Sequence, residues 1–392
     1  MPDPMREVGK RVATARRARR LSQLDLAAQA HISLSMLRKI EQGNRAPSDD
    51  TLDAIAAALG LDPSRLVADR TRTDGRVRAT LPALSAAIAS YDIPGAPPDR
   101  PLTALEAAAE EAQGWRLGAQ YVRLATAAPG LVADAAAALH SAPPKERARA
   151  ASVLFSVARS ADAVAYKFGA RDLSARLIEL MRWAAPRTSD PLATATTAYV
   201  RTEVFFAARA HEAGLRALHA AIDAAPSPRE ERTSAARGAL HMRAAVVAGR
   251  AGDAAAAVEH LGEAQRLAEG LRERVYAGTS FGPDSVRIHR VSVAVSLGGD
   301  HIANALEVAR QWKPPEVLPA ERRSGFYIEL ARAQLWTGQY DHAFASLKLA
   351  RRIAPQHTRE HPWARESAAT LRRLKRADAE SLTSFAEWIG AV

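Results

Sequence analysis

The sequence predicts an all-α protein, with a small N-terminal unit of five short helices followed by a long C-terminal array of helix pairs. Three observations predict it. Helix-capping residues recur at short intervals before residue 70, glycine and proline breaks recur throughout the rest, and patterns typical of strands are almost absent. With 392 residues, 47% of them hydrophobic, the chain is long enough for more than one core.

Composition and charge exclude some classes of protein. The chain has no cysteine, which excludes a disulfide framework, a thiolate nucleophile and cysteine-ligated zinc, and which is typical of a reducing cytoplasm. No apolar run approaches about 18 residues, so we expect neither a signal peptide nor a membrane span. The formal net charge of +11 favours a polyanionic partner.

Positive charge is concentrated at the start of the chain. The first 20 residues carry these basic side chains: Arg6, Lys10, Arg11, Arg16, Arg17, Arg19 and Arg20. Only Asp3 and Glu7 oppose them. Such a basic segment indicates either a surface that binds a polyanion or a solvated helix face. The residues that follow it decide between these two interpretations.

Three serines divide the N-terminal unit into helices. Ser22, Ser33 and Ser48 each precede a helical pattern and are good N-caps, and Asp25 completes a capping box with the first of them. Gly43, which can adopt a positive φ, ends the third helix. The predicted helices cover residues 6–20, 23–30, 33–42, 49–59 and 63–67.

This segment resembles the Xre family of helix-turn-helix proteins, which is similar to the lambda and 434 repressors. The matching patterns occupy residues 21–30, 32–43 and 47–60. The resemblance implies that the helix over residues 33–42 enters the major groove of DNA and presents its N-terminal residues to the base edges.

The predicted DNA-binding residues lie on or beside this helix. They are Gln23, Ser33, Leu34, Ser35, Arg38, Lys39, Asn44 and Arg45. Arg38 or Lys39 can donate to guanine O6 and N7, Ser35 can bond to several bases, and Leu34 can pack on a thymine methyl group. Family likeness implies that Gln23 holds a phosphate. Leu34 departs from the polar residue often found at its position, so DNA shape is expected to supply part of the specificity.

Arg16 and Glu41 match a family pair that bridges the first and third helices. The resemblance therefore implies a structural role for Arg16, while a contact from Arg16 to DNA remains an open alternative.

A linker with a short helix is predicted over residues 71–101. Its start, over residues 69–78, is charged, its end, over residues 93–101, is rich in proline and glycine, and a short apolar helix is predicted between them over residues 81–90. The predicted organisation is a helix-turn-helix domain over 1–70, this linker, and a repeat domain over 102–392.

Beyond residue 102 the sequence reads as a series of helices, with breaks predicted at Pro129, Gly214 and Gly338 among others. A spacing of roughly 34 residues between repeats is typical of tetratricopeptide repeats. The clearest copy runs from Tyr327 to Pro355 and resembles that family through Ala331, Gly338, Ala343 and Ala350. A second copy covers residues 245–264. A third copy, over residues 289–304, departs from the pattern because Asn304 occupies a small-residue position.

Stacked pairs of this kind form a right-handed solenoid with a concave surface, lined by the first helix of each pair. The predicted groove residues are Tyr199, Thr202, Phe206, Met242, Arg250, His289, Ile328, Arg332 and Trp336. Packing of one repeat on the next is the alternative role for each of them. Residues 281–289 also resemble a segment of actinobacterial Xre-type regulators that carry such repeats.

The resemblance implies a cytoplasmic, nucleoid-associated transcriptional regulator. We expect a homodimer that binds a pseudo-palindromic DNA operator and responds to a small-molecule or peptide effector in the groove, with no cofactor and no membrane partner. The alternative is a protein-interaction adaptor built on the repeats, in which DNA binding is secondary.

One segment matches a catalytic pattern. Residues His357-Thr-Arg-Glu360-His361 spell the inverted zinc-protease motif H-x-x-E-H. Pro362 follows directly and disfavours a helical His361, so the two histidines are not expected to share a helix face. We therefore predict neither a metal site here nor an enzyme.

Overall fold

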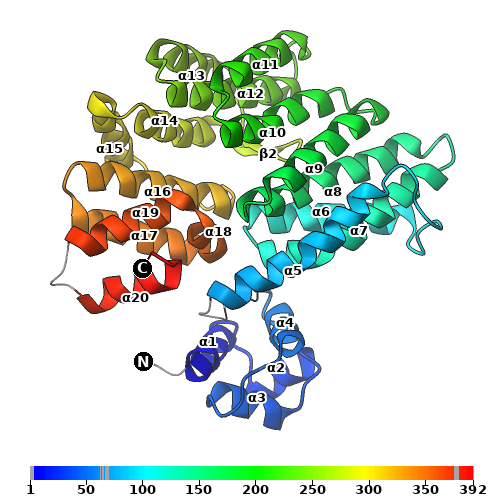
Figure 1. Ribbon diagram of the computed structural model, residues 1–392, viewed down its shortest axis with the longest axis vertical. Helices are drawn as coiled ribbons and strands as arrows, with labels where there is room; N and C mark the ends of the chain where they lie inside the picture. Colours follow the sequence, from blue (N-terminus) through cyan, green and yellow to red (C-terminus); the bar gives the residue numbers. More distant parts are fainter. Residues whose placement is uncertain (1–3, 62, 64–65, 67–69, 375–378, 392) are drawn as a thin grey trace.

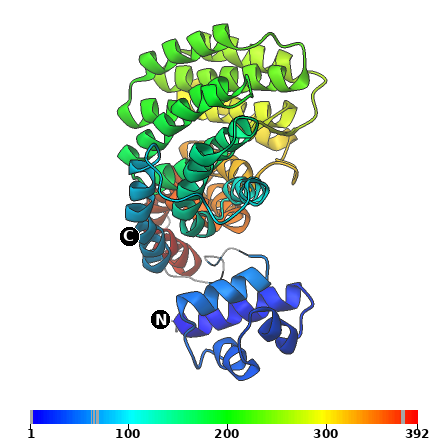
Figure 2. The same cartoon turned by 90° about the vertical axis from the view of Figure 1, so that its right-hand side faces the viewer.

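The computed structural model describes residues 4–61, 63, 66, 70–374 and 379–391. Within them the chain is helical apart from one short β-hairpin, which confirms the all-α fold class. Figure 1 shows the N-terminal helices as a small group beside a large curved array of helices. Figure 2, turned by 90°, shows the same separation.

The N-terminal group contains α1 (Pro4–Ala18), α2 (Gln23–Gln29), α3 (Leu34–Glu41) and α4 (Asp49–Ala58). The three predicted serine caps are confirmed. The hydroxyl groups of Ser22, Ser33 and Ser48 each accept the backbone N–H three residues further on, and Asp25 completes the capping box with Ser22. The fifth predicted turn, over residues 63–67, lies mostly outside the described residues.

Helices α1 and α3 cross at a backbone contact that requires glycine. A Cβ atom on Gly9 would lie only 2.2 Å from the carbonyl oxygen of Ile40. Gly43 adopts φ +75° and ends α3, as predicted. Between the helices, Val12 and Leu37 are completely buried. These contacts fix the orientation of α3 relative to the basic helix α1.

The curved array follows from residue 70. Its helices are α5 (Arg70–Ala89), α6 (Leu102–Leu117), α7 (Tyr121–Ser141), α8 (Arg147–Lys167), α9 (Arg171–Ala184), α10 (Ala193–Ala208), α11 (His211–Ala224), α12 (Glu231–Ala251), α13 (Ala254–Ala268), α14 (Pro283–Leu297), α15 (Ile302–Gln311), α16 (Ala320–Trp336), α17 (Tyr340–Ile353), α18 (Pro355–Glu360), α19 (Pro362–Leu374) and α20 (Ala379–Ile389). A hairpin of β1 (Arg274–Tyr276) and β2 (Thr279–Phe281) precedes α14.

The predicted linker helix over residues 81–90 is part of a much longer one. Helix α5 spans 20 residues and contains Pro82 in its interior. Its side chains Val77 and Leu84 are buried in the same core as α7, so most of α5 packs on the array. The helix is therefore longer than predicted, and its apolar residues pack against α7.

Helix pairs are found at all three predicted copies, as α12 with α13, α14 with α15, and α16 with α17. Gly252 and Gly338 make the turns within two of the pairs with φ +81° and +75°. In the third pair Asn304 is exposed, and the adjacent Ala305 is buried instead. A small residue therefore occupies the close contact between the two helices even in the copy that departs from the repeat pattern.

Two predicted breaks are wrong. Pro129 lies inside α7, and Gly214 lies inside α11. A Cβ on Gly214 would lie 3.2 Å from the Cβ of Phe205, so this glycine serves the close approach of α10 and α11 rather than a turn. Among the described helices α7 is the one apolar and long enough to cross a membrane, but 56% of its apolar window is buried inside the protein.

The β-hairpin packs on the helical array through an aromatic side chain. Phe281 on β2 is completely buried, and its ring lies against Gly238 of α12, where a Cβ atom would come within 1.9 Å. At the other end, Ala277 and Gly278 form the turn with positive φ angles of 44° and 74°. The turn is therefore held at a defined position inside the curve of the array.

The array closes on itself. The side-chain oxygen of Gln356, on α18, accepts the backbone N–H groups of Tyr121 and Val122 at the start of α7, at 2.6 and 3.2 Å. Helices α16 and α6 are also in contact, and both views of the molecule show this return. An ion pair between Arg76 of α5 and Asp53 of α4 joins the array to the N-terminal group.

Candidate functional site

The exposed face of α3 is the first candidate site. Ser35, Arg38 and Lys39 are exposed, whereas Leu37 and Ile40 are completely buried, as the helical spacing predicts. The side chains of Arg38 and Lys39 make no hydrogen bond or ion pair with any part of the chain that the structure describes. Their cationic groups are therefore available to a partner.

The other predicted DNA-binding residues near α3 differ in their exposure and in their contacts. Leu34 is half-buried and packs against the N-terminal core, so only part of it faces outward. Ser33 caps the helix through the N–H of Met36, at 3.1 Å. Asn44 and Arg45 are exposed just beyond the end of α3. The surface that α3 offers is thus mainly hydroxyl and cationic.

Arg16 and Glu41 form the predicted bridge between α1 and α3. The guanidinium donates to both carboxylate oxygens, at 2.7 and 3.1 Å. Gln23, expected at a phosphate, donates to the same carboxylate at 2.7 Å. Burial raises the pKa of Glu41, but the hydrogen bonds from Arg16 and Gln23 outweigh it, and the net shift is downward. The structural role of Arg16 is confirmed, and Gln23 shares that role in the DNA-free chain.

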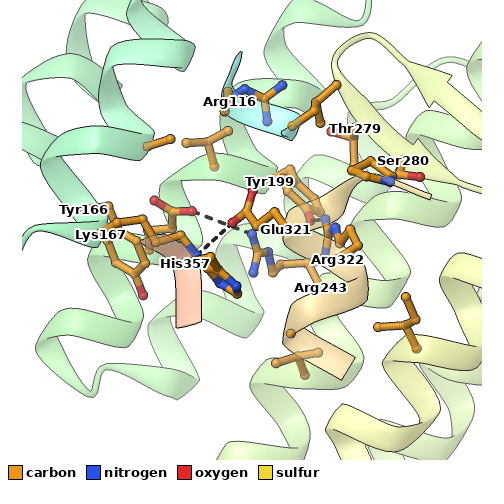
Figure 3. A pocket seen from close by; sticks show the side chains of 18 of the residues that line it. Arg116, Tyr166, Lys167, Tyr199, Arg243, Thr279, Ser280, Glu321, Arg322 and His357 are labelled. Atoms are coloured by element: carbon orange, nitrogen blue, oxygen red, sulfur yellow. Dashed lines mark hydrogen bonds and ion pairs between the residues drawn. The ribbon is translucent and has the colours of Figure 1, made fainter. Parts of the chain in front are cut away.

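The second candidate site is a cavity of about 240 Å³ inside the curve of the array. Helices α6, α8, α10, α12, α14, α16 and α18 and the hairpin all contribute to its lining. Figure 3 shows side chains from these elements converging on one space. Because the array closes through Gln356, residues more than 200 positions apart meet there.

The cavity is lined by charged groups of both signs, with cations in excess. Its cationic side chains are Arg116, Arg159, Lys167, Arg243, Arg250 and Arg322. Its acidic side chains are Asp162, Glu203, Glu321 and Glu329.

The pKa values of three of these four carboxyl groups are raised, which weakens their negative charge. Burial raises the pKa of Asp162 well above its ordinary value and also raises that of Glu203. Burial likewise raises the pKa of Glu329 to about 7. Glu321 is ionised, because the ion pair with Lys167 at 2.8 Å outweighs its burial and lowers its pKa (Figure 3). The acids therefore offset only part of the positive charge.

Arg116 and Arg159 bind the turn of the hairpin. Arg116 donates to the carbonyl oxygen of Gly278 at 2.7 Å, and Arg159 donates to the carbonyl oxygen of Ala277 and the hydroxyl of Thr279. Neither forms an ion pair with an acidic residue within the described ranges. Burial, reinforced by the charge of Arg116, lowers the pKa of Arg159 well below its ordinary value.

A third arginine of the cavity binds the hydroxyl group of a tyrosine. Arg322 donates to the Tyr199 hydroxyl at 2.5 Å. Burial alone would raise the pKa of Tyr199, but Arg243 and Arg322 lower it to about 8. His289 donates from Nδ1 to the carbonyl oxygen of Ser285 at 2.7 Å and presents Nε2 toward Arg322. Burial, followed by the charge of Arg322, lowers the pKa of His289 to about 3, so its imidazole is neutral.

The predicted groove residues separate into three groups. Tyr199, Phe206, Arg250 and His289 line the cavity. The residues buried away from its lining are Thr202, Met242 and Ile328. Those outside the cavity are Arg332 and Trp336, where the guanidinium lies 4.7 Å from the Trp336 ring and 4.1 Å from that of Trp363.

The most polar lining residues were missed by the repeat register. Arg116, Arg159 and Lys167 lie on α6 and α8, outside the three recognised repeat copies, and Arg322 lies on α16 just before the matched residues of the clearest copy begin at Tyr327. One usable signal is the presence of single charged residues within otherwise small and apolar helices, such as Arg159 in α8.

In the H-x-x-E-H segment His361 is not helical, as predicted, although its ring lies 5.4 Å from that of His357, centroid to centroid. Helix α18 ends at Glu360, and His361 is extended with ψ 120°. His357 bonds through Nδ1 to the hydroxyl of Ser324 at 2.6 Å. Over the part of the chain that the structure covers, no group of three or more His, Cys, Asp or Glu side chains is placed to hold a metal ion.

Together these observations define a helix-turn-helix domain attached to a helical repeat domain with a charged cavity. Residues 12–66 match the family model described as helix-turn-helix. The immunity repressor protein of Bacillus phage phi105 is 42% identical over 64 residues, which are 16% of this chain and 44% of the repressor. The chain thus spans less than half the length of this curated relative.

Two solved structures are similar at low overall agreement. One is Bacillus thuringiensis PlcR in complex with the peptide PapR7 and DNA, with 12% identity and a TM-score of 0.28 over 67% of this chain and 95% of that one. The other is the apo form of the competence regulator ComR from Streptococcus vestibularis, with 13% identity and a TM-score of 0.30 over 96% of this chain and 99% of that one.

Proposed function

We propose that this protein is a sequence-specific DNA-binding transcriptional regulator whose affinity for DNA is set by a ligand in the central cavity. The observation that carries the proposal is the exposed, unpaired pair Arg38 and Lys39 on α3, within a segment that matches the helix-turn-helix family model. The matched relative is named an immunity repressor, which agrees with this role.

In this proposal α3 lies in the major groove. Ser35, Arg38 and Lys39 reach base edges, and an arginine or lysine donating to guanine O6 and N7 is the commonest specific contact of this kind. Asn44 and Arg45 contact phosphates, which position the domain without reading sequence. Release of Gln23 from Glu41 would let its amide reach a phosphate as well.

The repeat domain provides control. The chain acts as a homodimer on a pseudo-palindromic operator, with residues 1–70 reading DNA, α5 connecting the two parts, and residues 102–392 sensing and dimerising. A ligand can shift operator affinity only if it binds the DNA-competent and incompetent dimers differently. The ion pair between Arg76 and Asp53 provides a direct contact through which movement of α5 would reach α4.

Selection of bound sequences from a random DNA pool tests this function. The full chain should enrich one motif with two-fold symmetry, and Arg38→Ala should relax the preference at one base position in each half-site. Arg290→Gln, which alters an exposed arginine on α14, is the matched control and should enrich the wild-type motif. Failure of the wild-type chain to enrich any motif, or an unchanged motif for Arg38→Ala, would contradict the proposal.

A further inference from the structure

The cavity holds more positive charge than its own residues neutralise. The exposed fraction of Arg116 is 9% and that of Arg159 is 6%, and neither has a carboxylate partner among the residues that the structure describes. Their hydrogen bonds to the hairpin satisfy donors but leave both guanidinium groups without an ion pair of their own. A buried charge without a counter-charge costs several kcal/mol, so such a cluster is suited to an anion.

The two guanidinium groups converge on a single point. A Cβ atom on Gly278 would lie 2.5 Å from one terminal nitrogen of Arg159 and 3.2 Å from one of Arg116. The third arginine, Arg322, is close enough to affect the titration of both. Arg116 and Arg159, from α6 and α8, therefore meet at the hairpin turn, and Arg322 of α16 lines the same cavity beside Tyr199.

Donors remain unused in the lining. The Nε–H groups of Arg116 and Arg243 are buried and have no hydrogen-bond partner within the described part of the chain. Planar guanidinium groups bind carboxylate and phosphate groups through paired N–H donors, which neutral ligands do not match as well. Among the described residues, one carboxylate oxygen of Glu329 is also without a hydrogen-bond partner, which leaves room for a hydroxyl or amine elsewhere on the ligand.

The size of the cavity limits the ligand. A volume of about 240 Å³ corresponds to roughly eight water molecules at about 30 Å³ each. It lies below the range of about 300–1,000 Å³ found for sites of drug-sized ligands. A small metabolite fits this space.

We propose that the cavity binds a small organic anion, with a carboxylate or phosphate group held between Arg116, Arg159 and Arg322 beside the turn of the hairpin. This inference names the ligand class for the regulator proposed above and rests on that proposal for its biological role. Anion binding would compete with the carbonyl groups of Ala277 and Gly278 for the same donors, and would thereby shift the hairpin.

The test is thermal melting of the full chain, followed by helical circular dichroism, with inorganic phosphate or succinate as the probe. Sodium chloride at equal ionic strength and the neutral analogue succinamide are the solution controls. Either anion should raise the melting temperature saturably, by about 3 °C or more, because a ligand that binds only the folded state stabilises it. A rise with phosphate alone identifies a phosphate site, and a rise with succinate alone identifies a carboxylate site.

Substitutions localise the effect. The rise should persist in Arg290→Gln and be lost in Arg159→Gln. No rise beyond that in sodium chloride, an equal rise with succinamide, or an equal rise in both variants would overturn the proposal.

A second measurement applies where Arg159→Gln fails to fold. On adding the effective anion, amide hydrogen exchange of the wild-type chain should slow at α6 and α8, and its rate should change at residues 274–281, where the hairpin shifts. Slowing confined to other segments would overturn the proposal. Neither experiment involves DNA, so failure of anion binding leaves DNA recognition intact, and failure of motif enrichment leaves the anion site intact.

Discussion

Arginine side chains occupy two opposite environments in this protein. On α3, Arg38 is exposed, comes with its neighbour Lys39 from one short helix, and keeps its hydration. In the cavity, Arg116 and Arg159 are more than nine-tenths buried and come from separate helices. An exposed cation costs little until it binds, whereas a buried one depends on everything around it. Changes on α3 should therefore alter binding alone, and changes at the cavity should alter stability too.

The largest effect on stability is expected where the hairpin is fastened. Gly238→Ala places a methyl group within 1.9 Å of the Phe281 ring and should destabilise the repeat domain by about 1–3 kcal/mol, the usual cost of overpacking. Gly262→Ala on α13 is the matched control, because no atom lies within 4 Å of its added Cβ. That change should stabilise by about 0.5–1 kcal/mol. Urea unfolding measures both, and equal effects would show that the hairpin contact is loose.

The next effect concerns pH at the cavity. The pKa of His289 is about 3 in the folded chain, against its ordinary value of 6.5, so only the unfolded chain takes up this proton as the pH falls below 6.5. Stability is therefore lost on acidification, by roughly 2 kcal/mol between pH 6.5 and about pH 5 from this group. His289→Asn keeps a donor for the carbonyl oxygen of Ser285 and removes that part of the loss. Urea titrations at the two pH values measure the loss in the free energy of unfolding. An identical loss in the variant and in the wild-type chain would refute a buried neutral His289.

Glu329 provides a control of opposite sign. Its pKa is about 7 in the folded chain, above the ordinary 4.5, so the folded chain binds more protons between these values. Its contribution to stability is therefore lost as the pH rises from 4.5 through 7. Glu329→Gln should make the chain less sensitive to that rise in the same urea titrations. A variant that becomes more sensitive to the rise would contradict the assigned direction.

The smallest effect on stability is expected on α3, where the arginine is exposed. Arg38→Ala should change stability by no more than about 0.5 kcal/mol, since substitutions at exposed sites without partners rarely do more. Thermal melting of the variant beside the wild-type chain checks this. A clear loss of stability would mean that Arg38 is a structural residue and that its exposure is not functional.

The two regions also differ in how far sequence alone predicts them. Serine caps and helical spacing are local features, so the helices of the N-terminal group and the outward direction of Arg38 follow from neighbouring residues. The cavity depends on closure of the array through Gln356, a contact between residues 235 positions apart. No local pattern encodes such a contact.

Small errors in helix register explain why some of the predicted groove residues do not line the cavity. One residue of shift turns a side chain by about 100° around a helix, which moves it from the lining into the packing between helices. Met242 and Ile328 were expected on the inner face and are buried in the cores, while Arg243 lines the cavity. The strands of the hairpin, each three residues long, are too short to give a period-two pattern.

Affinity for the enriched DNA motif, relative to a scrambled sequence at the same salt concentration, tests the central claim most directly. The wild-type chain should bind the motif at least about 10³-fold more tightly. Arg38→Ala should lower that ratio by about 5- to 150-fold, equivalent to about 1–3 kcal/mol at one base position, while changing affinity for the scrambled sequence far less. Equal affinity of the wild-type chain for both sequences, or an equal loss on both in Arg38→Ala, would show that α3 does not read DNA sequence.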